Sequence, residues 1–134
     1  MSLLALIIGA MIEHTGTSLA DAAEGAEEDF TMLCKCVEAE AGTQDLTGKR
    51  LVADVILNRV ESNLWPNTIK GVITQGRQFM VYPSPMNKTT PSQETIEACL
   101  MEQGERIDTE IIYFTSCGYI SAPAFKHGNH YFSY

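Results

Sequence analysis

Apolar residues recur at helical spacing in one stretch of the chain and fill a second stretch almost completely. From Phe30 they fall at i, i+3, i+4, i+7 and i+11, which predicts an amphipathic helix that ends at Gly42. Residues 46–61 carry Leu, Val and Ile at so many positions that neighbours are expected to cover this second helix on nearly all sides. The pattern therefore predicts a fold built around one buried central helix.

Shorter elements are predicted before and after these two helices. Residues 15–29 are small and acidic, which is typical of a connector that runs into a helix start. After a Trp-Pro pair, Asn67 is expected to cap a short helix that continues through Ile73. Pro83 and Pro85 prevent a regular helix, so we expect the chain around them to be irregular.

The last third of the chain is expected to hold one helix and a few short strands. Thr90 followed by Pro91 has the form of a cap and a first turn, and the helix is expected to continue to Gly104. Residues 110–115 are rich in Ile, Tyr, Phe and Thr and predict a strand, whereas residues 117–134 predict loops with short extended pieces. The expected fold class is α+β, mainly α, with a small strand element.

The first residues of the chain form a separate apolar segment. Residues 1–12 are too short to span a bilayer, which takes about 20 residues, and no Lys or Arg precedes them as in a signal peptide. We expect a helix that packs on the domain or on a neighbouring copy, so a homo-oligomer is one possible outcome. The expected division is an apolar helix and acidic connector over residues 1–29 and one domain over residues 30–134.

Length and charge narrow the classes of partner. A chain of 134 residues fits one domain. Lys and Arg total 9 against 17 Asp and Glu, which gives a formal net charge of −8. Such a surface repels phosphate backbones and anionic lipids, so we expect no nucleic-acid partner. The remaining partners are neutral, cationic or held by short-range contacts.

The cysteines and histidines do not predict a metal or redox site. Cys34 and Cys36 are two residues apart and face different directions on a helix, so they are poor ligands for one metal ion. We expect most cysteines to be small buried hydrophobes, and a thiol redox protein is the least favoured class. His127 and His130 lack a third ligand nearby, so neither a metal nor a cofactor is expected.

Glu40 is the residue that departs from the amphipathic pattern. It lies beside the apolar stripe of its helix and close to the carboxyl end, where burial and the helix dipole both disfavour a charged carboxylate. A raised pKa is therefore expected, as for the general acid that cleaves a glycosidic bond. The alternative is an ion pair with Arg59 or Arg50. Glu38 and Lys35 are expected to be solvated.

A series of short motifs resembles the SleB-type cell-wall hydrolases, a family that includes the spore cortex-lytic enzymes. The matching segments are residues 37–42, 48–60, 65–69 and 71–73, Gln75, Gln78-Phe79 and residues 128–132. In this order they cover roughly residues 30–134. The resemblance implies a lysozyme-like, lytic-transglycosylase-like fold, a peptidoglycan substrate and a location outside the cell or at the cell wall.

The resemblance also assigns roles to individual positions. The family's catalytic Glu, in its Glu-Ala motif, falls on Glu40, whereas Gln44 stands where many members carry a second Glu. Residues 80–85 depart from the Gly-rich or polar loop that is usual in the family. We expect Asp54, Asn58 and Arg59, the polar groups of the central helix, to be structural supports that tie it to the loops of the cleft.

A further set of residues is expected to contact the glycan. Their amides are expected to bind sugar hydroxyls, and their rings and other polar groups are expected to lie against the sugars. These residues are Gln75, Gln78, Phe79, Tyr113, His130 and Tyr131. For Phe79 the alternative is packing in the core. For His130 the favoured role is a packed, hydrogen-bonded anchor of its loop.

One convincing carboxylate favours a mechanism with a single acid. Most glycosidases use two carboxylates, and Asp45 and Asp54 are only weak candidates for a second. We therefore expect a lytic transglycosylase that cleaves between N-acetylmuramic acid and N-acetylglucosamine, with Glu40 as acid and then base. The alternatives are a hydrolytic muramidase and a non-catalytic wall-binding module.

Overall fold

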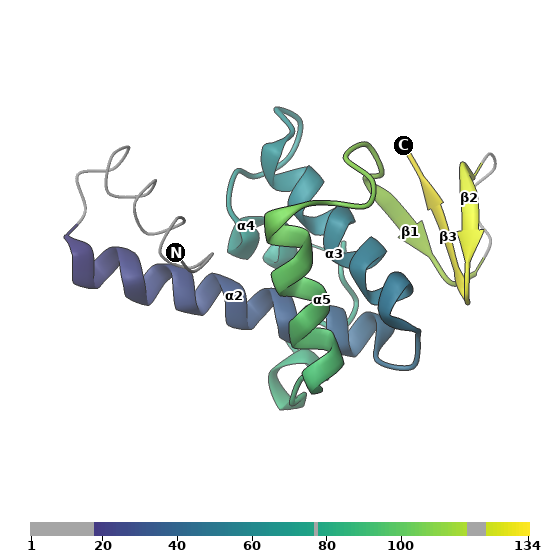
Figure 1. Ribbon diagram of the computed structural model, residues 1–134. Helices are drawn as coiled ribbons and strands as arrows, with labels where there is room; N and C mark the ends of the chain where they lie inside the picture. The colour runs from purple at the N-terminus through teal and green to yellow at the C-terminus, as the bar shows by residue number, and fades with distance from the viewer. Residues whose placement is uncertain (1–17, 77, 118–122) are drawn as a thin grey trace.

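The computed structural model describes residues 18–76, 78–117 and 123–134, in which helices pack around one central helix beside a small sheet (Figure 1). The elements are α2 (Leu19–Ala41), α3 (Leu46–Glu61), α4 (Ile69–Thr74), the 3-10 helix η1 (Met86–Lys88), α5 (Gln93–Gly104), β1 (Tyr113–Thr115), β2 (Phe125–His127) and β3 (His130–Ser133). The predicted α+β, mainly α class is confirmed. Within the described part of the chain, no helix is both long and apolar enough to cross a membrane.

α2 begins earlier than the sequence pattern predicts. Ser18 caps it, because its side-chain oxygen accepts a hydrogen bond from the Asp21 N–H, and the helix then runs from Leu19 without a break to Ala41. The prediction of a connector over residues 15–29 is therefore wrong from residue 19 onward. Alanine and glutamate dominate this stretch and are strong helix formers, which the acidic composition obscured. The apolar residues 1–12 lie outside the described residues.

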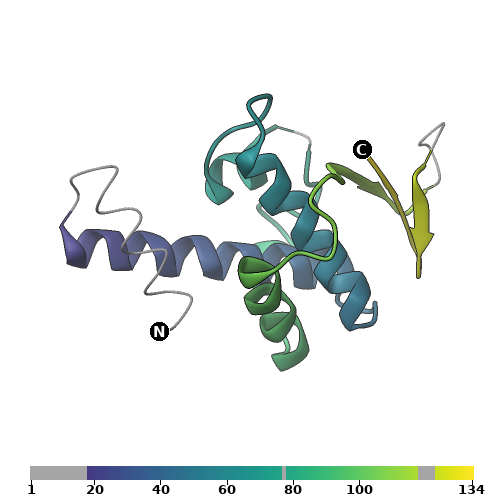
Figure 2. The same ribbon diagram turned by 45° about the horizontal axis from the view of Figure 1, so that its top comes forward.

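α3 is the central helix that the sequence predicts, with the predicted bounds. Asp45 caps it by accepting a hydrogen bond from the Gly48 N–H, and every residue from Leu51 to Arg59 is buried. Figures 1 and 2 show α3 crossing α2, and α5 packs against both. Burial of a Val, Ile or Leu side chain stabilises the fold by roughly 1.5–3 kcal/mol, so α3 supplies much of the core energy.

The caps of the two shorter helices differ from the predicted ones by one or two residues. Thr68, not Asn67, caps α4, because its Oγ1 accepts a hydrogen bond from the Gly71 N–H at 2.9 Å. Ser92, not Thr90, caps α5, because its Oγ accepts from the N–H of Thr95 at 3.2 Å. Two polar residues of cap type lie close together at each start, and the one that directly precedes the first helical residue reaches the free N–H groups.

The sheet lies at the opposite end of the molecule from the start of α2 (Figure 1). Its strands are antiparallel in the order β1-β3-β2, and the predicted strand over residues 110–115 is shorter, since it begins at Tyr113. The extended pieces predicted in the last residues are confirmed as β2 and β3. The turn between them contains Gly128 at a φ of 54°, a left-handed conformation that glycine adopts without strain.

Two side-chain contacts hold the β2–β3 turn against the start of α3. His127 Nε2 lies 2.8 Å from Asp45 Oδ1, and the Gln44 side-chain oxygen accepts a hydrogen bond of 3.0 Å from the Asn129 N–H. Both partners on the helical side lie in the short connection between α2 and α3. The sheet is therefore fixed next to the end of α2 that carries Glu40.

Candidate active site

Glu40 is half-buried near the carboxyl end of α2, one residue before the helix ends. Burial raises the pKa of its carboxyl from 4.5 to about 7, so a large fraction of the molecules carry a protonated Glu40 at neutral pH. It forms no ion pair with any residue that the structure describes. The alternative of a pair with Arg50 or Arg59 is wrong, because Arg50 binds Glu102 and Arg59 donates to the Ile112 carbonyl oxygen.

Glu38 lies two residues before Glu40 and has the opposite electrostatic character. Its Oε1 accepts hydrogen bonds from the Ser92 N–H at 2.6 Å and from the Thr95 hydroxyl at 2.9 Å. Partial burial acts to raise the pKa of Glu38, but these hydrogen bonds outweigh it and the net pKa is lowered. The expectation that Glu38 is solvated is wrong, since protein groups hydrogen-bond its carboxylate, whereas Lys35 is half-buried.

Three of the four cysteines are buried hydrophobes, as the sequence predicts. Cys34, Cys36 and Cys99 are buried, and Cys117 is exposed. The pKa of the Cys36 thiol is raised well above its ordinary value, first by burial and then by the charge of Glu40, while Arg59 acts to lower it. A thiol that resists ionisation is a poor nucleophile, so the redox class has no support at Cys36.

Arg59 organises an aromatic cluster beside Cys36. Its guanidinium carbon lies 4.1 Å from the centre of the Trp65 ring, 5.3 Å from that of Phe79 and 5.5 Å from that of Tyr113. Its Nε donates a hydrogen bond of 2.7 Å to the Ile112 carbonyl oxygen, directly before β1. Because the charges of Glu40 and Arg59 both reach the Cys36 thiol, this cluster lies near Glu40.

The other polar groups of α3 bind the segment that leads into β1. Asn58 Nδ2 donates to the carbonyl oxygens of Asp108 at 3.0 Å and Ile111 at 2.8 Å. Asp54 Oδ2 accepts from the Asp108 N–H at 3.1 Å. Burial, followed by a hydrogen bond with the Glu102 carboxyl and by its charge, raises the pKa of Asp54 well above its ordinary value. These contacts set the position of β1 relative to α3.

Asp45, a weak candidate for a second catalytic carboxylate, contacts the start of α3 and the β2–β3 turn. It caps α3 and contacts His127, whose hydrogen bond is the main reason that the pKa of Asp45 is lowered. No group of three or more potential metal ligands occurs among the described residues.

The predicted glycan contacts divide into accessible and buried groups. Gln75 and Gln78 are exposed in the loop after α4, Tyr113 is 42% exposed, and Tyr131 is half-buried beneath the Lys126 ammonium. Phe79 is only 4% exposed and belongs to the hydrophobic core, so the alternative of core packing is the one that the structure supports.

His130 is the second predicted contact that the structure buries. It is 4% exposed and lies in strand β3 rather than in a loop, with its ring edge-on to Phe114 at 5.3 Å. Its Nδ1 has no hydrogen-bond partner among the described residues, so the predicted hydrogen-bonded loop anchor is wrong in this respect. Burial lowers the pKa of His130 and keeps the ring neutral.

Sequence reasoning missed the position of Trp65 and the contacts that hold the β2–β3 turn. The sequence places Trp65 in a matching motif and gives it no contact, yet its half-buried ring covers Arg59 and meets the Tyr113 ring edge-on at 5.9 Å. The pairing of Asp45 with His127 spans 82 residues and leaves no local signal.

Comparison with known proteins finds a matching family model and similar proteins. Residues 43–133 match the family model described as cell wall hydrolase. The spore cortex-lytic enzyme of Bacillus cereus is 33% identical over 75 residues, which is 56% of this chain and 29% of that protein. The chain therefore spans about three-tenths of the length of that curated relative.

Two solved structures share the fold over most of the chain. The catalytic domain of the germination-specific lytic transglycosylase SleB from Bacillus anthracis is 28% identical with a TM-score of 0.68, over 78% of this chain and 92% of that one. The SleB catalytic domain from Bacillus cereus is 26% identical with a TM-score of 0.71, over 79% and 89%. The fold expected from the motifs is thereby confirmed, and the chain belongs to the cell wall hydrolase family.

Proposed function

We propose that this chain cleaves the glycan strands of peptidoglycan between N-acetylmuramic acid and N-acetylglucosamine, as a lytic transglycosylase with Glu40 as its catalytic residue. The observation that carries the proposal is a half-buried carboxyl with a pKa of about 7, because a general acid works best when its pKa lies near the working pH. The similarity to proteins named spore cortex-lytic enzyme and lytic transglycosylase supports the same substrate and reaction.

In this mechanism Glu40 first donates its proton to the glycosidic oxygen. The bond between that oxygen and C1 of the muramic sugar breaks, and positive charge develops on the sugar ring. The Glu40 carboxylate then removes the proton from the C6 hydroxyl of the same sugar, whose oxygen attacks C1. The product is a 1,6-anhydro sugar, Glu40 regains its proton, and no water is consumed.

The surroundings of the other acidic groups support a single-carboxylate mechanism. Asp54 is fully buried, which raises its pKa, and Asp45 is held by the start of α3 and by His127. Gln44, which stands where many relatives of the resembled family carry a Glu, uses its side-chain oxygen to bind the β2–β3 turn. Asp54 is closed off from solvent and Gln44 has no carboxylate, so neither can activate a water molecule as a second carboxylate does. Asp45 is exposed, but its Oδ1 is engaged by the Gly48 N–H and by His127.

The glycan contacts that we propose are the accessible members of the predicted set. Gln75 and Gln78 supply amides for sugar hydroxyl and N-acetyl groups. Tyr113 supplies an exposed ring next to the Arg59 cluster, and Tyr131 lies on the neighbouring strand β3. With a peptidoglycan substrate, we propose that the chain acts outside the cell, at the cell wall or spore cortex.

Digestion of purified sacculi, with the products analysed by mass spectrometry, tests the reaction. Transglycosylation yields muropeptides whose muramic end is lighter by one water than the product of hydrolysis. Wild-type chain is expected to release the lighter product, and the Glu40→Gln chain is expected to release none. Products that carry the extra water mean that the chain is a muramidase instead.

The alternative is a wall-binding module without catalysis, for which the departures at Gln44 and residues 80–85 argue. Co-sedimentation with sacculi separates the two functions. Binding without release of any muropeptide supports the module, whereas lysis that persists in the Glu40→Gln chain removes Glu40 from the catalytic role.

A further inference from the structure

Cys34 and Cys99 come from two different helices and lie inside the same hydrophobic core. Cys34 belongs to α2 and is 3% exposed, and Cys99 belongs to α5 and is 0% exposed. The pKa of the Cys99 thiol is raised well above its ordinary value, first by a hydrogen bond with the Cys34 thiol and then by burial. The two sulfur atoms are therefore neighbours across the contact between α2 and α5.

Hydrogen bonds one helical turn away hold α2 and α5 together beside this pair. Glu38 lies four residues after Cys34, and Thr95 lies four residues before Cys99, so each shares a helix face with its cysteine. Glu38 Oε1 accepts hydrogen bonds from the Thr95 hydroxyl at 2.9 Å and from the Ser92 N–H at 2.6 Å. Figures 1 and 2 show α5 packed across α2. The two cysteines thus occupy facing positions at a contact that other bonds already fix.

Facing positions on two packed helices suit a disulfide. Helix axes pack about 8–10 Å apart, and Cα atoms lie about 2.3 Å from each axis. Cα atoms that face each other directly are therefore separated by roughly 3.5–5.5 Å, and by more when they are offset. A disulfide takes Cα atoms that are about 4.4–6.8 Å apart. The two ranges overlap, so the bond can form without pulling the helices apart.

The other two cysteines are not placed to compete for either partner. Cys36 lies about 200° around the axis of α2 from Cys34, at 100° per residue. The charges of Glu40 and Arg59 both act on the Cys36 thiol, and Arg59 belongs to α3. Cys117 is exposed and follows β1. The pairing that fits the structure is Cys34 with Cys99.

We propose that Cys34 and Cys99 form a disulfide that cross-links α2 to α5 when the chain folds in an oxidising environment. The inference rests on the proposed location outside the cell, because disulfides persist there whereas cytosolic thiols stay reduced. It goes beyond the proposed reaction, in which no thiol takes part. The cross-link fixes the helix that carries Glu40, and α3, α4 and η1 all lie within the closed loop.

The bond forms by thiol–disulfide exchange, with a small-molecule disulfide as the oxidant. The thiolate of one cysteine attacks a sulfur of the oxidant, which gives a mixed disulfide and releases one small thiol. The thiolate of the other cysteine then attacks the protein sulfur of the mixed disulfide and releases the second small thiol. The two cysteines lose two protons and two electrons in total, and the oxidant gains them as it becomes two thiols.

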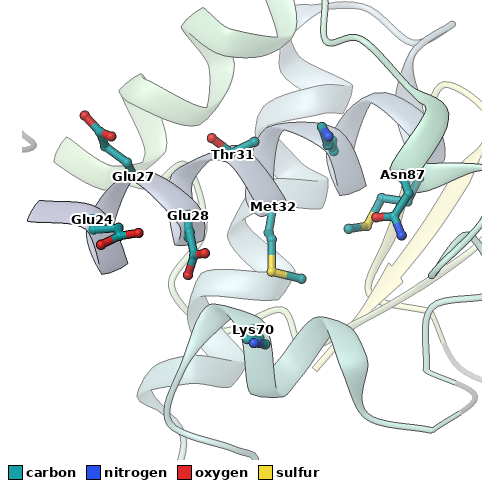
Figure 3. A pocket seen from close by; sticks show the side chains of 9 residues that line it. Glu24, Glu27, Glu28, Thr31, Met32, Lys70 and Asn87 are labelled. Atoms are coloured by element: carbon teal, nitrogen blue, oxygen red, sulfur yellow. The ribbon is translucent and has the colours of Figure 1, made fainter. Parts of the chain in front are cut away.

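The grooves along α2 do not open onto either thiol. One groove of about 370 Å³ lies between α2, α4 and η1, where Figure 3 shows Glu28 and Met32 extending from α2 toward α4. A second groove of about 250 Å³ is lined by residues of α2 and α5 that include Phe30 and Gln103. Neither cysteine is among the described residues that line these grooves. Because exchange requires an accessible thiolate, the bond forms during folding and is afterwards protected from reductants.

Refolding of the Cys117→Ala chain from urea, in a buffer of reduced and oxidised glutathione, tests the inference without the exposed thiol. Free thiols are blocked with N-ethylmaleimide in denaturant, and linked peptides are identified by mass spectrometry after digestion without reduction. The expected product links Cys34 to Cys99 and carries one blocked thiol at Cys36. Its Tm is expected to exceed that of the same chain refolded in excess reductant by roughly 10 °C, because the link closes a long loop.

Cys36→Ala in the same background is the matched control, since it removes a buried cysteine from the same helix. It is expected to keep the linked pair and the Tm difference, whereas Cys34→Ala is expected to lose both. If a variant does not refold, the peptide map of the parent chain still decides the pairing. A parent chain with all three thiols blocked, a link that includes Cys36, or a linked chain with no gain in Tm overturns the inference.

Digestion of sacculi by the same preparations separates this inference from the proposed function. If glycan is cleaved and the thiols stay free, only the cross-link inference fails. If Cys34 and Cys99 are linked and glycan stays intact, only the proposed function fails.

Discussion

Replacement of Glu40 by Gln is expected to stabilise the fold in a manner that depends on pH. The carboxyl has a pKa of about 7 when folded and 4.5 when free, so the folded state holds the proton more tightly. As pH rises from 4.5 to about 7, ionisation of Glu40 lowers the free energy of the unfolded state but not that of the folded state. Stability of the wild-type chain is therefore lost through this window, whereas glutamine has no proton to lose.

The size of the effect follows from the difference between the two pKa values. At 1.36 kcal/mol per pKa unit, the raised pKa of Glu40 lowers the free energy of unfolding by about 3 kcal/mol above pH 7. Near pH 5.5 the cost is only about 1 kcal/mol by the same relation. The Glu40→Gln chain is expected to be more stable than wild type by these amounts, with the advantage growing as pH rises.

Urea unfolding measures this difference in the free energy of unfolding. The transition is monitored by the fluorescence of Trp65, the single tryptophan of the chain. Measurements from pH 5.5 to pH 8.5 stay above the isoelectric point of about 4.7. A difference that does not change with pH, or a variant that is less stable than wild type at pH 8.5, refutes the assignment of a raised pKa to Glu40.

Glu38→Gln provides a matched control in the same helix, with the opposite sign expected. Because hydrogen bonds from Ser92 and Thr95 outweigh partial burial and lower the pKa of Glu38, its ionised form stabilises the folded state above pH 4.5. That stability is lost as pH falls through the folded pKa. The Glu38→Gln chain is therefore expected to be less stable than wild type across the measured range.

Three further outcomes are expected. Wild-type kcat/KM on sacculi is expected to fall as pH rises above about 7, because Glu40 must carry a proton to act as the acid; a profile that is flat to pH 9 contradicts this. Thr68→Ala is expected to lower the free energy of unfolding by about 1 kcal/mol and Asn67→Ala by much less, measured by urea unfolding. Arg59→Met is expected to lower Tm more than Arg59→Lys, which keeps the charge beside Trp65.

The sequence by itself determined the central helix and the residue with unusual chemistry. α3 has its predicted bounds because every position from Leu51 to Arg59 is buried, which makes its pattern unambiguous over a short window. The raised pKa of Glu40 was predictable because its place beside the apolar stripe depends only on helical spacing, and burial proved to be its cause. Both predictions use only the spacing of apolar residues along a helix.

Only the tertiary structure decided which side chains lie inside and which segments meet. Phe79 and His130 carry groups suited to a glycan, yet packing against Phe114 and its neighbours covers both rings. Glu38 is ordered by Ser92, 54 residues away, and Asp45 by His127, 82 residues away. The physical reason is that burial and the pairing of polar groups depend on distances in space, which spacing along one chain determines only within a helix or a strand.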